Sequence, residues 1–155
     1  MAKRLIRLDI VNGNPRSIVA EQNLEQGLFV RMVGRAENTH LGVEADFEAY
    51  KVELASADTA RGELMLHASV ANQYDERLSE VDFELEKGRV GRAYQPVMGD
   101  IVTIPKVDGV NVGDKLGLGA NGLLVAGGEL VVVEAIEDIT IPEADPQESM
   151  VIRFL

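Results

Sequence analysis

Glycine residues followed by short runs of apolar and β-branched residues recur along this chain of 155 residues. Glycine accepts the positive φ angles of tight turns, and the residues that follow suit a pleated, half-buried surface. Each run therefore predicts a turn that opens a β-strand. The runs begin at Gly27, Gly99, Gly113 and Gly128.

The segments between these turns constrain the fold class. No helical pattern of about 10–15 residues separates the predicted strands, which argues against alternating strands and helices. We therefore expect a mainly β protein, a small barrel or sandwich-like domain or domains with long loops and at most short helices, near residues 20–26 or 75–80. A shift toward Val, Leu, Gly and Ala predicts an N-terminal β region, residues 1–98, and a Gly-rich C-terminal β subdomain, residues 99–155. One single domain, 1–155, is the alternative.

The N-terminal segment predicts a basic first strand. Ile6, Leu8 and Ile10 alternate with Arg7 and Asp9, so one face is expected to pack on a core and the other to meet water. An open strand edge here would be a template for pairing with the sheet of a neighbour.

Residues 43–54 fit both a strand and a helix, because apolar residues occur there at both spacings. We favour a strand with a bulge near Ala49 and Tyr50. A turn-rich link follows, so this strand is expected to pair with the run that begins at Glu63 in a long-looped hairpin.

Charged residues dominate the stretch from Gln73 to Pro96, and apolar residues are sparse. This pattern indicates an exposed excursion, a charged loop at about residues 73–96, that is either simply solvated or in contact with a partner. Its carboxylates at Asp75 and Glu76 also offer an acid/base pair, the basis of a third hypothesis, a small hydrolase.

Composition and charge exclude several function classes. The chain has 26 acidic and 15 basic residues, a net charge of −11 and no cysteine. The acidic excess argues against a nucleic-acid partner, and the missing thiols exclude disulfides and Cys-ligated metals. Apolar runs are too short for a signal peptide or a membrane-spanning helix, so we expect a soluble protein with no membrane partner. Residues 1–35 are net positive by three, whereas the remaining 120 carry −14.

The motifs for catalysis and cofactors are weak. Residues 117–122 match the dinucleotide fingerprint, but strands rather than a helix follow, and Asn121-Gly122 predicts a type I′ hairpin turn instead. His40 and His67 have no second ligand at metal-binding spacing, and His67, in an apolar run, is expected to be a hydrogen-bonded structural histidine. No G-x-S-x-G motif occurs. We expect a protein that is not an enzyme, with no cofactor and no metal.

Several short motifs carry a resemblance. Tyr74-Asp-Glu-Arg77, Arg92-Ala-Tyr94, Gly99-Asp-Ile-Val-Thr103, Val112-Gly-Asp-Lys-Leu116, Gly122-Leu-Leu-Val-Ala-Gly127 and the final Val-Ile-Arg-Phe-Leu follow one another from residue 74 onward. The order resembles small structural proteins that decorate the capsid of tailed phages. Residues 37–70 have no counterpart in that pattern.

The resemblance implies a β-rich, non-enzymatic head decoration or cement protein. Such a protein would be made in the host cytoplasm and lie on the capsid exterior of the virion, bound to the major capsid protein and to copies of itself, with a trimer as the expected homo-oligomer. The alternative is a soluble β-rich ligand-binding or assembly module of a bacterial complex with no phage role. Candidate contact residues are Lys3, Arg4, Arg7, Tyr74, Asp75, Arg77, Arg89, Arg92 and Tyr94.

Overall fold

A computed structural model describes residues 6–35, 49–69, 84–140 and 145–155. The chain is mainly β, as predicted, and the described residues include only two short helices, the 3-10 turns η2 (Arg61–Glu63) and η4 (Ala120–Gly122). The strands are β1 (Arg7–Ile10), β2 (Asn14–Ala20), β3 (Leu24–Glu25), β4 (Phe29–Arg35), β5 (Ala49–Leu54), β6 (Leu64–His67), β7 (Glu84–Leu85), β8 (Val90–Gln95), β9 (Ile101–Pro105), β10 (Lys115–Leu118), β11 (Leu124–Ala126), β12 (Val131–Ile139) and β13 (Gln147–Phe154).

Five strands close into a barrel in the order β2-β5-β4-β6-β8. β2 and β5 run parallel, and the other neighbouring pairs whose registers are defined run antiparallel. Side chains inside the barrel form a cluster of their own, which includes Ile18, Val30, Val52, Met65 and Ala93. β3 and β7 form a separate two-stranded sheet.

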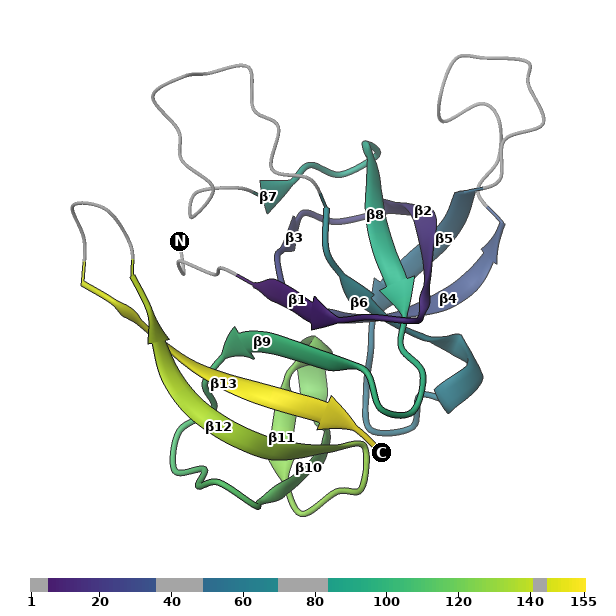
Figure 1. Ribbon diagram of the computed structural model, residues 1–155. Coiled ribbons are helices and arrows are strands. Elements are labelled where there is room, and N and C mark those ends of the chain that lie inside the picture. Colours follow the sequence, from purple (N-terminus) through teal and green to yellow (C-terminus); the bar gives the residue numbers. More distant parts are fainter. Residues whose placement is uncertain (1–5, 36–48, 70–83, 141–144) are drawn as a thin grey trace.

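The other strands form an open six-stranded sheet in the order β1-β9-β13-β12-β10-β11. Figure 1 shows this sheet below the barrel, with β1 beside β9. β1 comes from the N-terminal end of the chain, whereas its five partners lie beyond residue 100, so the sheet joins segments that are distant in sequence. The turn between β8 and β9 contains the predicted boundary at residues 98 and 99.

A second cluster of buried side chains fills the space between barrel and sheet. It includes Leu66 and Tyr94 from the barrel and Ile152 from the sheet. The rings of Phe29 and Phe154 meet edge to face across this cluster, with centroids 6.1 Å apart. β4, β6 and β8 bury alternate residues in the barrel and against the sheet, which explains the consecutive apolar residues at the start of β4 and in β6.

The predicted hairpin between residues 43–54 and the run after Glu63 is wrong. The described part of the first run, β5, is a strand as expected, but β5 and β6 pair with opposite edges of β4. β4 presents Val30 to both neighbours, opposite Leu54 and Met65. Alternating apolar and polar residues predict that a segment is a strand, but they do not predict which strands are neighbours in the sheet.

Two other predictions need correction. Residues 20–26 contain turns and β3 rather than a helix, and the second expected helix, near residues 75–80, lies outside the described residues. The expected exposed excursion at residues 73–96 is wrong for β8, a wall strand of the barrel that buries Ala93 and Tyr94. Glu86, Lys87 and Arg89, which precede β8, are exposed as expected.

Three of the four predicted glycine turns are confirmed, and at the fourth the positive φ is at Gly127, one residue before the predicted Gly128, ahead of β12. Gly27, Gly99 and Gly113 have φ angles of 77°, 92° and 93° and precede β4, β9 and β10. Asn121 and Gly122 both have positive φ, 58° and 72°, and lie in the hairpin between β10 and β11. These angles match a type I′ turn, and no helix follows, so the apparent dinucleotide fingerprint is a hairpin.

Candidate docking surface

The candidate contact residues are dispersed in the fold. Lys3, Arg4, Tyr74, Asp75 and Arg77 lie outside the described residues. Arg7 is on the open sheet, whereas Arg89 and Arg92 are exposed on the barrel side of the molecule.

The prediction that Tyr94 is a contact residue is wrong. Its side chain belongs to the cluster between barrel and sheet, and only 3% of the residue is exposed. Burial, with a smaller effect of the nearby Asp100 carboxylate, raises the pKa of the Tyr94 hydroxyl far above its usual value of 10.0. The hydroxyl therefore stays protonated, and it has no hydrogen-bond partner among the described residues.

Arg7 lies at the centre of a charged network on the outer face of the sheet. Its guanidinium pairs with Glu137 of β12 and with Asp9, and donates to the Thr103 hydroxyl at 3.1 Å. The Thr103 hydroxyl in turn donates to Asp9 at 2.7 Å. Hydrogen bonds to Glu137 and Asp9 raise the pKa of Arg7. Strand β1 is thereby tied to β9 and β12, while the Arg7 side chain stays 53% exposed.

The expected burial of one face of β1 is wrong, because all four of its residues are exposed. Leu8 and Ile10 are 45% and 56% exposed, whereas Ile6, just before the strand, and Val11, just after it, pack on the core cluster. A register shift between Leu8 and Ile10 interrupts the alternation and places Ile10 opposite Ile101. The expected open edge is confirmed for the described part of the chain, in which β1 is the last strand of its sheet.

A buried carboxylate fixes the neighbouring corner of the molecule. Asp100 is fully buried and accepts hydrogen bonds from the backbone N–H groups of Asn12, Gly13 and Val97, at 2.9, 3.1 and 3.1 Å. It thus joins the link between β1 and β2 to the turn between β8 and β9. A carboxylate that accepts several backbone N–H groups locks a loop in place.

The locked corner presents apolar side chains to water. Val97 and Met98 are 44% and 80% exposed, and Ile10 lies on the strand that leads into the Asn12-Gly13 link. Ile10, Val97 and Met98 therefore lie on backbone segments joined through one carboxylate, and we call them the Asp100 corner. Met98 has the highest exposure among the large hydrophobic residues described.

A second turn repeats this local chemistry elsewhere on the sheet. Asn111 donates its N–H to the Asp114 carboxylate at 2.8 Å, and the Asp114 N–H donates to the Asn111 carbonyl at 3.1 Å. In the first turn Val97 and Asp100 exchange the same two bonds, each at 3.1 Å. Val112 occupies the place of Met98 and is 61% exposed. Of the two turns, the Asp100 turn is the one whose carboxylate also binds a second segment that carries an exposed apolar residue, Ile10.

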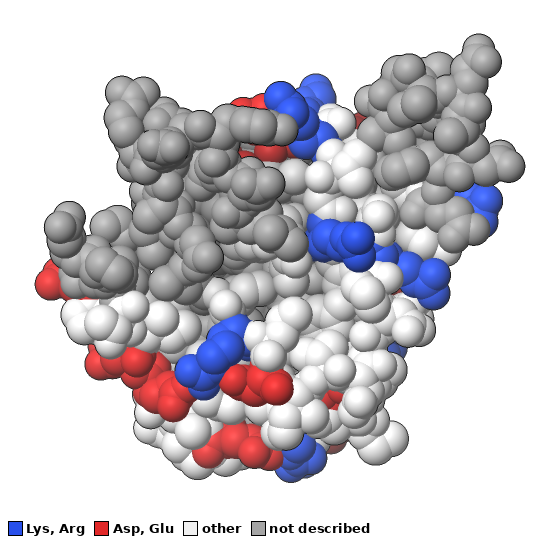
Figure 2. Space-filling view, turned by 45° about the horizontal axis from the view of Figure 1, so that its top comes forward, with Lys and Arg blue, Asp and Glu red and all other residues white. Residues whose placement is uncertain are grey.

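The surface charge differs between the two regions. Described residues of the barrel and its connections, 14–35, 49–69 and 84–95, carry eight basic and seven acidic side chains, whereas those of the sheet, 6–13, 96–140 and 145–155, carry four and ten. In the view of Figure 2, acidic side chains are grouped in the lower part, where the sheet lies, and Lys and Arg side chains lie over the barrel. Arg7 is thus a basic residue in acidic surroundings.

His67 is a structural histidine, as expected. It is fully buried, and its Nδ1 lies 2.7 Å from the Glu25 carbonyl, while Nε2 lies 2.6 Å from the Ser69 hydroxyl. Burial lowers its pKa below 6.5. The neutral ring that donates from Nδ1 and accepts at Nε2 fits both neighbours. Ser69 also accepts a hydrogen bond from the Arg92 N–H at 3.0 Å. His67 and Ser69 thus link β6 to β8 in the barrel wall.

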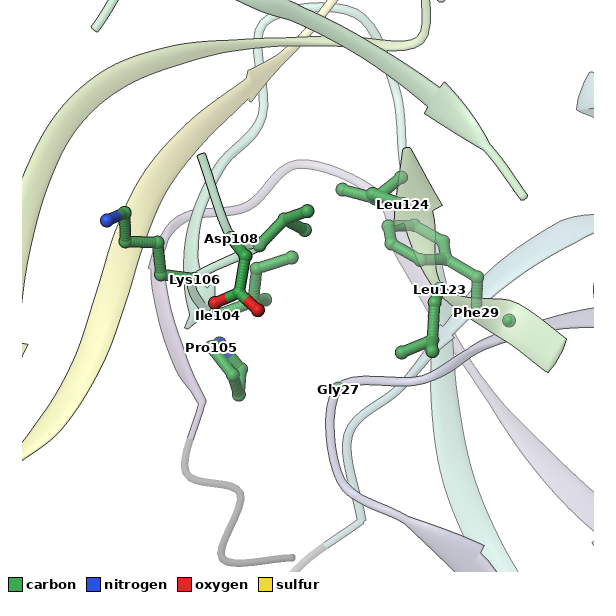
Figure 3. Close-up of a pocket in the computed structure, with 10 residues that line it drawn as sticks. Gly27, Phe29, Ile104, Pro105, Lys106, Asp108, Leu123 and Leu124 are labelled. Atoms are coloured by element: carbon green, nitrogen blue, oxygen red, sulfur yellow. The ribbon is translucent and has the colours of Figure 1, made fainter. Parts of the chain in front are cut away.

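A pocket of about 240 Å³ opens between barrel and sheet. In Figure 3, Phe29 and Leu124 line one side and Ile104 lies opposite, with the Asp108 carboxylate pointing into the opening and Lys106 pointing away. The apolar lining with a single carboxylate suits a small ligand with an apolar body and a polar end.

Within the described ranges, no group of three or more His, Asp or Glu side chains is placed to hold a metal ion. No helix in the same ranges is long and apolar enough to cross a membrane. Comparison with known protein families, with curated proteins and with solved structures finds no match to this chain.

Proposed function

We propose that this protein is a structural, non-enzymatic component of a phage virion, which binds the outer surface of the icosahedral capsid and stabilises or decorates it. Its partner in this proposal is the major capsid protein, and its place is the exterior of the virion. Two independent lines support the proposal: the motifs that resemble decoration proteins, and the exposed apolar corner on the sheet.

The Asp100 corner is the observation that carries the proposal. Exposed apolar side chains that lie together mark interaction sites, and a surface held rigid before binding loses little conformational entropy on docking. Met98 is 80% exposed on a turn whose carboxylate accepts three backbone N–H groups. The corner is therefore already ordered in the free protein and suits a broad, fixed surface such as a shell.

The test is a binding measurement with empty shells assembled from a tailed-phage major capsid protein whose gene neighbours the gene of this chain; a genome without such a neighbouring gene would count against the proposal. Wild-type protein is expected to bind to saturation at a fixed stoichiometry and to raise the temperature at which the shells disassemble. Met98→Asp is expected to weaken binding by roughly tenfold or more, because it places a charge in an apolar contact. Val112→Asp is the matched control, since it adds the same charge at the equivalent position of the other turn.

Absence of saturable binding by the wild-type protein would refute the capsid role. Equal binding by the Met98→Asp and Val112→Asp variants would refute the Asp100 corner as the docking surface. Unchanged circular dichroism of both variants shows that the fold is intact, so that a loss of binding reports on contact.

The pocket favours the second candidate, a ligand-binding module. Its volume of about 240 Å³ lies just under the range of roughly 300–1,000 Å³ usual for ligand sites, so it suits a small molecule. Leu123, which lines the pocket and is 44% exposed, can be replaced by Trp to fill it. Under the capsid proposal Leu123→Trp leaves shell binding unchanged. Under the alternative it abolishes the thermal shift that a bound small molecule produces.

A further inference from the structure

Strand β1 is an edge of the open sheet with an unusual degree of exposure. β9 is its one neighbour in the sheet, and no described residue pairs with the opposite edge of β1. All four residues of the strand are exposed. A free edge offers a row of backbone N–H and C=O groups to another strand.

The sequence of this edge is complementary to itself. Residues 6–10 read Ile-Arg-Leu-Asp-Ile, and Leu8 is the centre of symmetry. If two copies pair antiparallel about Leu8, each Arg7 faces Asp9 of the second copy. Ile6 packs on the core of its own copy and a register shift precedes Ile10, so the two charged residues set this pairing. Directly opposed side chains in antiparallel strands have Cβ atoms about 4.5–5.5 Å apart, close enough for ion pairs and apolar contacts.

We propose that β1 pairs antiparallel with β1 of a second copy, so that two six-stranded sheets join into one continuous sheet across a twofold axis. The interface is isologous, because each contact occurs twice. It is also small, since only a short strand from each copy takes part, so weak and concentration-dependent association is expected.

The contacts within one copy prepare the edge for this pairing. Glu137 and Thr103 hold Arg7 on the outer face of the sheet, and Thr103 holds Asp9 on the same face. The two opposite charges are thus fixed two residues apart along the strand. A guanidinium has five N–H donors, so Arg7 can keep its own partners and still reach a second carboxylate.

The strand at the opposite edge of the sheet, β11, has no such self-complementary sequence. β11 consists of three residues, Leu-Val-Ala, and carries no charge. A short apolar strand does not fix a register or favour one partner, although Val125 is as exposed as Leu8, at 45%. The barrel is closed and offers no edge. Self-pairing is therefore assigned to β1.

This inference does not depend on the capsid proposal, because it concerns the free protein in solution. A symmetric β1 pair closes at two copies, whereas the resemblance to decoration proteins implies a trimer. Self-association without shells and binding to shells are separate measurements, and either can fail alone.

A cysteine at the proposed twofold axis tests the register. The chain has no cysteine, so one introduced thiol reports on a single position. In the full-length protein, Leu8→Cys is expected to form disulfide-linked dimers under mild oxidation, because the two residues face each other at a disulfide-compatible separation. Val125→Cys, equally exposed on the opposite edge, is the control and is expected to cross-link at least tenfold more slowly. Equal rates, or no dimer from Leu8→Cys, would overturn the proposal.

Charge reversal tests the complementarity. Arg7→Asp alone places Asp opposite Asp at two places, and Asp9→Arg alone places Arg opposite Arg. Each change is expected to weaken dimerisation by roughly tenfold or more in analytical ultracentrifugation, since both copies of the pair are affected. An equimolar mixture of the two variants restores both opposite-charge pairs and is expected to form heterodimers.

The matched control for charge is Arg31→Asp on the barrel wall. Arg31 pairs with Glu53 as Arg7 pairs with Asp9, and its side chain is 39% exposed. Its reversal is expected to leave the dimer dissociation constant unchanged. Wild-type protein that stays monomeric at all concentrations, an oligomer that neither β1 reversal weakens, or a mixture of reversals that fails to associate would each overturn the proposal.

Discussion

The barrel and the six-stranded sheet differ in whether they leave unpaired backbone N–H and C=O groups at a strand edge. The barrel closes on itself and has no edge, whereas the sheet ends in β1 and β11. Closure removes templates for pairing with other chains, and an open sheet keeps them. The sheet also carries the exposed apolar corner and most of the described acidic side chains. Both proposals of contact with partners, at the Asp100 corner and at β1, therefore concern the sheet rather than the closed barrel.

The largest effect is expected where the two regions meet. Phe154, fully buried on β13, packs against the Phe29 ring of the barrel, so Phe154→Ala is expected to lower the free energy of unfolding by about 3–5 kcal/mol. Urea unfolding followed by circular dichroism measures the loss, and Val125→Ala on the exposed edge is a near-neutral control. Two separate transitions in the wild-type protein would contradict a shared core.

The corner of the sheet is expected to show an intermediate effect. Asp100→Asn removes the charge that accepts three backbone N–H groups, and we expect a loss of about 2–3 kcal/mol of stability. Asp114→Asn is the matched control, because its carboxylate accepts the Asn111 N–H in an exposed turn; about 1 kcal/mol or less is expected. Similar losses at both positions would show that Asp100 does not organise the corner.

The smallest effect is a pH dependence confined to the barrel. Burial lowers the pKa of His67 from 6.5 in the folded state, so the unfolded chain binds a proton first as the pH falls. The stabilisation is complete above pH 6.5 and declines below it, by at most about 1.4 kcal/mol per pH unit, until the folded pKa is reached. Urea titrations at several pH values measure the slope, and His67→Gln is expected to flatten it. A slope unchanged by that substitution would assign the dependence to other groups.

Local patterns in the sequence predict much of this fold. The mainly β class, the turns at Gly27, Gly99 and Gly113, and the Asn121-Gly122 hairpin all depend on neighbouring residues, and all are confirmed. The placement of β4 between β5 and β6 depends on pairing across the chain, which alternation does not encode.

The candidate surface was less predictable, for a physical reason. Arg7 and the open edge follow from the first strand, but Tyr94 lies in a charged stretch and is nevertheless buried. The Asp100 corner depends on N–H groups from residues 12 and 13 that reach a carboxylate 88 and 87 residues away. A Gly-Asp pair directly after an apolar residue, which occurs at both turns, is the one signal in the sequence that indicates such a locked, exposed tip.

Cryo-electron microscopy of empty shells incubated with the protein tests the central claim most directly, because it shows whether and how the sheet meets a partner. The account predicts ordered density on the outside of the shell, with the sheet side inward and Met98 of the Asp100 corner in contact with the major capsid protein. Shells without added density, or density in which the closed barrel makes the contact and the Asp100 corner faces solvent, would contradict it.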